Sequence, residues 1–180
     1  MISECTMQID YNAVSAWAAV IMSIAAIIAI VITIVELILE SKRNRFSTGL
    51  NAIMWLDDIW KSTRMKQERK IAAQALRDNP SDDIDEILDF FEVVGLLVRR
   101  KAIDEVLAWH FYFYWLHGYR TLATAYIDAK RKQESTVWVD LLYLHERFID
   151  IEKRKRKCSG KELAISPEDA RQFIEEEINQ

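Results

Sequence analysis

One uncharged apolar segment constrains this chain more than any other feature. Residues 13–35 have the sequence AVSAWAAVIMSIAAIIAIVITIV, twenty-three residues without a charged side chain. As a helix rising ~1.5 Å per residue, the segment would reach ~35 Å, and the hydrocarbon core of a bilayer is ~30 Å thick. A helix buried in a soluble domain seldom continues that far without a polar face. We therefore predict a transmembrane helix over residues 13–35.

The charges that flank this segment predict its orientation. The first forty residues contain no Lys or Arg, whereas Lys42, Arg43 and Arg45 follow the segment closely. Basic residues near a span favour the cytoplasmic side. We therefore expect residues 1–12 to be a short extracytoplasmic N-terminus and the residues after the span to lie in the cytoplasm. A cleaved signal peptide is the competing interpretation, but it has a basic start and a shorter apolar region of roughly 7–15 residues.

One half of the predicted span is rich in small side chains when residues are placed at ~100° intervals. This small-residue face consists of Ser15, Ala19, Ser23, Ala26, Ala29 and Thr33. Lipid tails do not require such segregation, whereas small residues let two helices approach closely. We expect this face to pack against another span, and a second copy of the chain is the simplest partner. A chance scatter of alanine, which is common in spans, is the alternative.

Composition limits what the remaining residues can do. The net charge of −4 equals the four acidic residues of the first forty, so residues 41–180 are electrically balanced. A balanced region lacks the basic surface of a nucleic-acid-binding domain, and we expect no nucleic-acid partner. Cys5 and Cys158 fall on opposite sides of the predicted membrane, so no disulfide should join them. Together with three scattered histidines they lack zinc-ligand spacing, and we expect neither a metal nor a cofactor.

The part after the span is predicted to be helical throughout. The chain has only four glycines and two prolines, and it lacks alternating strand patterns with turn residues. We expect helices at about 46–61, 62–77, 81–101, 104–129 and 136–157. These form a cytosolic helical bundle over residues 36–157, so the fold class is all-α with an N-terminal transmembrane helix. Residues 158–180 should be a linker and a C-terminal helix capped at Ser166-Pro167, with the last twenty residues loosely held.

Two of these helices carry the clearest core pattern. Ser81 is predicted to cap a helix whose apolar residues recur at i, i+3, i+4 and i+7. The stretch 104–129 is aromatic and apolar almost all the way round, which indicates a central helix enclosed by others. The predicted core consists of Ile87, Phe91, Val94, Trp109, Phe113, Trp115 and Trp138.

His110, Tyr114 and His117 lie on one narrow face of the aromatic helix and form a candidate ligand groove. Two histidines on this face could bind a ligand or a metal. The alternative is that the face is simply the wetter side of a central helix. Neither His110 nor His117 has a carboxylate three or four residues later, and no third ligand is near, which argues against a metal. His145 lies within an apolar face and is predicted to be a hydrogen-bonded core residue.

A run of five basic residues is the densest charge in the chain: Lys153, Arg154, Lys155, Arg156 and Lys157. Such a run can contact anionic lipid at the cytoplasmic surface, at about 1 kcal/mol per basic residue. The alternative is a solvated helix end, whose positive charge suits the C-terminal end of the helix dipole.

The segment Asp89–Arg100, DFFEVVGLLVRR, followed by Ala102-Ile103-Asp104, resembles an uncharacterised family of prokaryotic and phage membrane proteins, a domain of unknown function. Tyr114-Trp115 and the closing Trp138, Leu144 and Arg147 are similar to the same family, over roughly residues 40–157. The resemblance implies one N-terminal span in the prokaryotic inner membrane and a helical cytosolic region, with no activity attached. Where members often have a glycine before Ala-Ile-Asp, this chain has Lys101.

The sequence contains no phosphate-binding glycine loop, nucleophile elbow or paired-cysteine motif, so no catalytic residue is predicted. We expect a non-enzymatic, membrane-anchored helical module that self-associates and recruits a cytosolic protein partner. A second hypothesis is a membrane effector, for example in phage defence or exclusion, whose spans assemble and perturb the membrane. An anchored enzyme that uses the His110 and His117 face is the remaining alternative.

Overall fold

The computed structural model describes residues 32–37, 39–40, 46–78, 81–157 and 163–179. Every regular element in these ranges is a helix, which confirms the all-α class. The chain divides into two compact units, Met1–Asn44 and Arg45–Gln180. In the first unit residues 32–37 and 39–40 are helical, and they include Thr33 of the small-residue face. The rest of the predicted span, with its other small residues, lies outside the described residues.

Within the ranges that the structure describes, no helix combines the length and the apolar character needed to cross a membrane.

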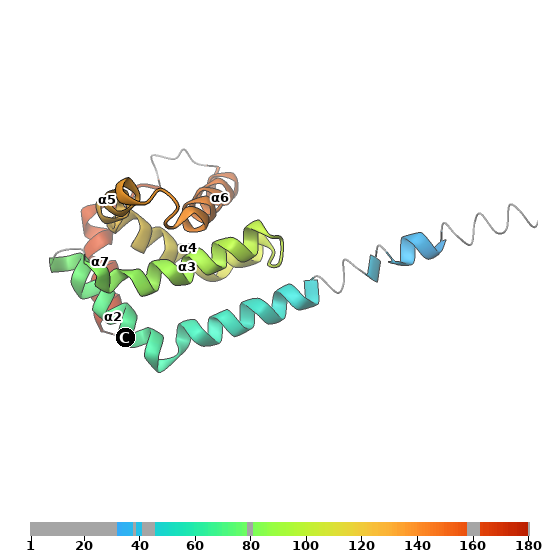
Figure 1. Ribbon diagram of the computed structural model, residues 1–180, viewed down its shortest axis with the longest axis horizontal. Coiled ribbons are helices and arrows are strands. Elements are labelled where there is room, and N and C mark those ends of the chain that lie inside the picture. Colours follow the sequence, from blue (N-terminus) through green and yellow to red (C-terminus); the bar gives the residue numbers. More distant parts are fainter. Residues whose placement is uncertain (1–31, 38, 41–45, 79–80, 158–162, 180) are drawn as a thin grey trace, which may run out of the picture. The chain divides into compact units, whose positions relative to one another are not determined.

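The second unit begins with two helices close to the predicted bounds (Figure 1). Residues 46–61 are helical, and α2 follows at Thr63–Asp78. Ser62 separates the two helices, and its side-chain oxygen accepts a hydrogen bond from the backbone N–H of Met65 at 3.2 Å. A serine in this place satisfies one of the N–H groups that the first turn of a helix leaves unpaired.

The helix predicted from Ser81 starts in another way. Asp82–Ile84 form the 3-10 helix η1, and α3 follows at Asp85–Arg99. The Ser81 hydroxyl donates to the Asp83 carboxylate at 2.9 Å and accepts no bond from the backbone N–H groups of η1. Ser81 is thus the N-cap residue, as predicted, but its hydroxyl binds the Asp83 carboxylate instead of a backbone N–H.

α3 packs most extensively on α6 (Val139–Arg156). Gly95 permits the close approach, because a Cβ atom added there would lie 2.1 Å from the carbonyl oxygen of Asp140. No side chain larger than hydrogen fits between two backbones at that distance. Leu88, Phe91 and Leu141 are fully buried where the two helices meet. This contact is the apolar centre of the bundle.

Acidic side chains of α3 fix the start of α6. The indole N–H of Trp138 donates to Asp89 at 2.8 Å, and the backbone N–H of Leu141 donates to Glu92 at 2.6 Å. Trp138 has a left-handed backbone (φ 51°), so the helix begins just after it rather than at Thr136. The side chain of Trp138 is buried, as predicted.

The aromatic stretch forms two helices instead of the one predicted. α4 (Glu105–Leu122) and α5 (Thr124–Gln133) meet at Ala123. The Thr124 hydroxyl lies 2.8 Å from the carbonyl oxygen of Thr121 and 3.1 Å from that of Arg120. A threonine hydroxyl that competes for helix carbonyls bends or interrupts a helix. Thr124 thus accounts for the break.

α4 contacts α3, α6 and α7, and only one narrow face of it, with Val106, His110 and Tyr114, is exposed. Its buried residues are Ala108, Tyr112, Leu116, Gly118 and Tyr119. Trp109, Phe113 and Trp115, which were predicted to form the core, are only half-buried. The prediction of a central helix therefore holds for most of α4, whereas the predicted core residues Trp109, Phe113 and Trp115 pack against the buried core without being fully buried themselves.

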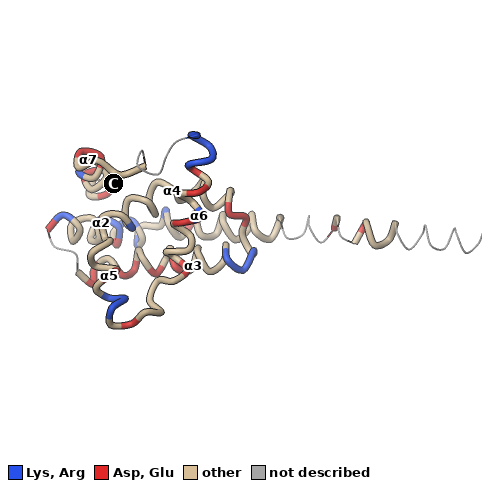
Figure 2. The backbone as a smooth tube through the Cα atoms, turned by 90° about the horizontal axis from the view of Figure 1, so that it is seen from above, with Lys and Arg blue, Asp and Glu red and all other residues tan. Residues whose placement is uncertain are grey.

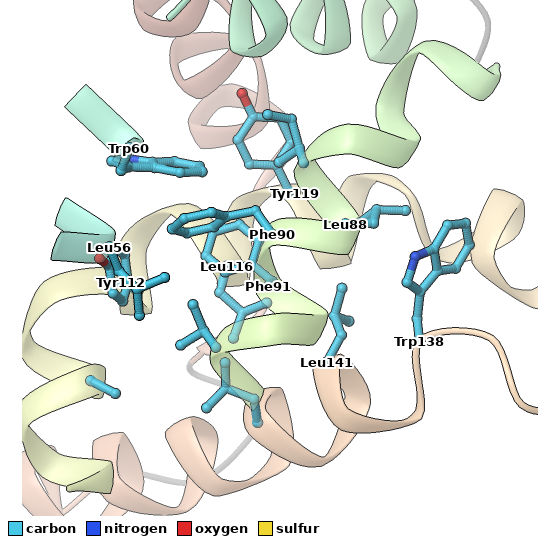
Figure 3. Packing of buried hydrophobic residues seen from close by; sticks show 14 of the residues in the cluster. Leu56, Trp60, Leu88, Phe90, Phe91, Tyr112, Leu116, Tyr119, Trp138 and Leu141 are labelled. Carbon is cyan, nitrogen blue, oxygen red and sulfur yellow. The ribbon is translucent and has the colours of Figure 1, made fainter. Parts of the chain in front are cut away.

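Among the described residues, the largest side chain that is fully buried is that of Trp60, which was not among the predicted core residues (Figure 3). Its ring centre lies 4.8 Å from that of Phe90, 5.2 Å from that of Phe91 and 6.3 Å from that of Tyr112. These rings come from residues 46–61, α3 and α4, so they join three helices. The predicted core residues Ile87, Phe91 and Val94 are fully buried.

The turn between α3 and α4 places Lys101 in the left-handed region, with φ 57°. The N–H of Lys101 donates to Val98 and the N–H of Ala102 donates to Leu97, both at 2.9 Å. This pair of bonds is the Schellman motif, whose left-handed position is usually glycine. Glycine would therefore suit this position, and the structure shows that Lys101 adopts the left-handed conformation there.

α7 (Pro167–Ile178) begins as predicted, because the Ser166 hydroxyl accepts from the N–H of Asp169 at 3.1 Å. It packs on α2 and α4 and buries Phe173 and Glu177. The prediction that the last twenty residues are loosely held is wrong for this helix. Half of its residues are charged, and the local sequence gives no sign of the distant residues that Phe173 and Glu177 contact.

Candidate functional site

A cavity of about 300 Å³ lies between α4, α7 and the end of α6. Tyr114 and His117 line it from α4, Phe173 from α7 and Arg156 from α6. The structure thus brings together two of the three predicted groove residues. His110 is exposed on α4 outside this cavity, because α7 covers only the later turns of that helix face.

His117 forms a pair with His145 of α6. The Nδ1 atom of His117 lies 3.0 Å from Nε2 of His145, and the two rings are stacked at 5.4 Å. The Nε2 atom of His117 lies 2.8 Å from the carbonyl oxygen of Leu163. A carbonyl oxygen only accepts, so Nε2 of His117 carries a proton. In the neutral ring Nδ1 then accepts, and Nε2 of His145 donates to it.

The surroundings keep this pair uncharged at neutral pH. Burial lowers the pKa of His145 to about 3, with additional repulsion from His117 and Arg120. Burial also lowers the pKa of His117, while the Leu163 carbonyl and Glu152 act in the opposite direction. The pair can therefore donate and accept hydrogen bonds, but it carries no positive charge and does not act as an acid at neutral pH. Among the described residues, no three His, Cys, Asp or Glu side chains are grouped to hold a metal ion.

Tyr114 stands at the edge of the cavity and is half exposed. Its hydroxyl donates to Glu176 at 2.6 Å, which ties α4 to α7. This bond lowers the pKa of the Glu176 carboxyl, while burial and the bond to Glu176 raise the pKa of the Tyr114 hydroxyl. Tyr114 is thus already hydrogen-bonded within the chain.

The basic run continues α6 to its end (Figure 2). Arg156 pairs with Glu152, and the ammonium of Lys155 lies 3.7 Å from the centre of the Trp109 ring. Arg154 donates to the carbonyl oxygen of Asp150 at 3.1 Å. Lys157 ends the helix in a left-handed conformation. Residues 154–157 are all exposed, but Lys155 and Arg156 have side-chain partners in Trp109 and Glu152, and Arg154 contacts only a backbone carbonyl of its own helix.

A second cavity, of about 570 Å³, lies beside the α3–α4 turn and was not predicted. Arg99, Lys101 and Arg147 contribute three cations to its lining. Arg147 binds both carboxylate oxygens of Glu105, at 3.0 and 2.8 Å, and Arg99 binds Asp140 at 2.8 Å. Two of the three cations are therefore already neutralised by carboxylates.

The sequence also did not reveal a buried ion pair between α2 and α7. The guanidinium of Arg69 donates to both oxygens of Glu177, at 2.7 and 2.5 Å, and the two side chains are 4% and 1% exposed. Tyr119 donates to Glu177 at 2.6 Å, and the indole N–H of Trp115 donates to it at 3.2 Å. Arg69 lies 4.7 Å from the centre of the Trp60 ring. We call these five residues the Arg69–Glu177 network.

Comparison of the sequence with known proteins identifies the family to which this chain belongs. The family model of a domain of unknown function (DUF4760) matches residues 13–148, well over half of the chain. The chain belongs to this family. No solved structure and no functionally curated protein matches it. The expected resemblance to a domain of unknown function is thereby confirmed, and family membership assigns no activity.

The DUF4760 match divides the Arg69–Glu177 network. Trp60, Arg69, Trp115 and Tyr119 lie within the matched residues, whereas Glu177 and all of α7 follow them. The match also begins at the first residue of the predicted span. One signal could have identified the network from the sequence, because Arg69 interrupts a face of α2 that otherwise buries Met65, Ala72 and Ala73.

Proposed function

We propose that this DUF4760 protein is a non-enzymatic, membrane-anchored helical module that self-associates and recruits a cytosolic protein partner. The observation that carries the proposal is the uncharged segment 13–35, which is long enough for a span. The family match includes this segment together with most of the helical bundle. An anchor inherited as part of the family domain suits a protein that works at a membrane.

Exposed apolar side chains on the helical segment 46–61 support the recruiting role. Trp55 is 60% exposed and Met54 48%, and Leu50 is also exposed. Aromatic side chains and methionine are enriched at protein–protein interfaces. These residues suit contact with another protein better than contact with water.

The proposed topology places residues 1–12 outside the cytoplasm and residues 41–180 inside it. Cys5 should then react with a membrane-impermeant maleimide in spheroplasts, and Cys158 should react only after lysis. Labelling of Cys158 but not Cys5 in intact spheroplasts would contradict the anchor in this orientation.

The proposed self-association uses the small-residue face of the span. The double variant Ala19→Leu, Ala26→Leu should weaken crosslinked oligomers, because large side chains keep two helices apart. The matched control, Ile24→Leu with Ile28→Leu on the opposite face, should leave them intact. Equal behaviour of the two variants, or a monomer in mild detergent, would count against this part of the proposal.

The membrane effector remains the second candidate, because the same small-residue face would let several spans assemble. Growth arrest with dye leakage on expression would favour the effector, and intact membranes would favour the recruiting module. In either case we propose that Arg154 and Lys157 contact anionic lipid. With the chain reconstituted in anionic vesicles, replacing both with Ser should make the neighbouring Cys158 react faster with a maleimide, and an unchanged rate would refute that contact.

A further inference from the structure

α7 docks on the bundle through two side chains one helical turn apart. The Phe173 ring packs on Tyr119, with ring centres 5.1 Å apart, and it sits directly over Gly118. A Cβ atom added at Gly118 would lie 2.5 Å from that ring. Four residues later, Glu177 binds Arg69. We call Arg69, Trp115, Gly118 and Tyr119 the α7 docking site.

The chemistry of this site is that of a recognition site for a carboxylate. Arg69 presents a planar fork that matches both oxygens of Glu177, and Tyr119 and Trp115 add a hydrogen bond each. A buried ion pair stabilises a protein little compared with apolar side chains of the same size, but a buried charge without its partner is costly. The site therefore discriminates strongly between a helix that carries the carboxylate and one that lacks it.

The docking site lies inside the part of the chain that matches the family model, and its occupant, α7, lies outside it. All four residues of the site lie within the part of the chain that the family model matches, and α7 lies beyond it. The matched part of this chain thus contains the whole docking site. α7, which follows the match, fills the site in this chain.

We propose that the α7 docking site is a second recruiting surface of the domain, beside the exposed apolar side chains of residues 46–61, and that α7 occupies it in cis until a partner replaces it. The partner that fits is a protein helix with an aromatic residue and a carboxylate four positions apart, as in Phe173 and Glu177. This inference rests on the recruiting role proposed above, but it requires neither the span nor self-association. The tether to α6 gives α7 a high effective concentration, so the partner competes against an occupied site.

The test uses the full chain in detergent micelles and a fluorescent peptide of residues 165–180 as the probe. Phe173→Ala in the chain should release α7 and leave the docking site intact, so that this variant binds the peptide about tenfold or more tightly than the parent chain. Glu177→Ala is the second releasing variant and should act in the same direction. Circular dichroism establishes that each variant remains helical.

Gly118→Leu is the matched control variant. The added side chain fills the place of Phe173, so this chain should also release α7 but should bind no peptide. A peptide with Glu177→Gln should lose binding to the Phe173→Ala chain, whereas Glu175→Gln, at an exposed position, should keep it.

Two results would overturn the proposal. One is that both releasing variants stay folded and bind the peptide no better than the parent, which would make α7 a permanent part of the bundle. The other is exchange of α7 between labelled copies of the parent chain, which would make a second copy the occupant. The cysteine labelling and span crosslinking are independent of this assay, so either proposal can fail while the other stands.

Discussion

The α3–α6 contact and the α2–α7 contact hold helices in the same bundle by different chemistry. The first buries apolar side chains and brings backbone against backbone at Gly95. The second centres on the Arg69–Glu177 ion pair with hydrogen bonds from neighbouring aromatic residues. Apolar packing accepts many side chains of suitable volume, whereas a buried ion pair accepts one partner. The comparison suggests that α6 belongs to the permanent core and that α7 is a selective attachment.

The largest expected effect tests the apolar contact. Phe91→Ala should lower the free energy of unfolding by about 3–5 kcal/mol, because it leaves a cavity among fully buried rings. Denaturant melts of the full chain in detergent, monitored by helical circular dichroism, measure this loss. A loss below about 1 kcal/mol would show that the site collapses around the missing ring and would weaken the distinction drawn here.

Arg69→Ala should have a smaller effect on global unfolding and a large local one. The variant removes the guanidinium that binds Glu177, and breaking a buried pair in this way costs about 3–5 kcal/mol in a rigid interior. α7 can avoid much of this cost by detaching and exposing Glu177 to water. Amide hydrogen exchange should therefore accelerate throughout α7 while α3 and α6 keep their protection. If amide exchange accelerated equally in all helices, the distinction between α6 as part of the core and α7 as an attached helix would be wrong.

The histidine pair sharpens the comparison, because His117 bonds the carbonyl of Leu163 just before α7. A histidine whose pKa is lowered in the folded state binds fewer protons there than in the unfolded state, so stability falls as the pH falls below about 6.5. For His145 this loss continues toward its folded pKa of about 3. His145→Leu should therefore lose less stability than the parent between pH 6.5 and 4.

The measurement for this prediction is the difference between the two pH profiles of thermal unfolding. The difference cancels the carboxyl groups that titrate in both chains. His117, Arg120 and Glu152 remain around the site in both chains and set the residual slope. Parallel profiles would show that His145 takes up its proton equally in both states.

The smallest expected effect on stability is that of replacing Arg64, which lies five residues before Arg69 on α2. Arg64 pairs with Glu86 at 2.6 Å, but its side chain is 77% exposed. Exposed ion pairs contribute about 0–1 kcal/mol, so Arg64→Ala should barely change the melting temperature or the exchange of α7. A change as large as that of Arg69→Ala would show that burial is not what distinguishes the two arginines.

The sequence predicted the helical class and most helix positions because apolar periodicity is a local property. Periodicity did not predict the break at Ala123, where the Thr124 hydroxyl bonds the carbonyl oxygen of Thr121. Periodicity also grouped His110 with His117, because both lie on one face of the same helix. It could not predict that α7 covers this face only near His117. Arg69 and Glu177 lie 108 residues apart in the sequence, and no local pattern joins them.

The packing of Trp60 and Trp115 around Arg69 has an optical consequence. Their ring centres are 5.6 Å apart at an angle of 63°, close enough for the two indoles to couple electronically. The guanidinium lies over both rings, and the Glu177 carboxylate balances its charge from one side. When α7 leaves, the electric field on both indoles changes and water reaches Trp115. The near-ultraviolet circular dichroism and the tryptophan emission of the unlabelled chain therefore report whether α7 is docked.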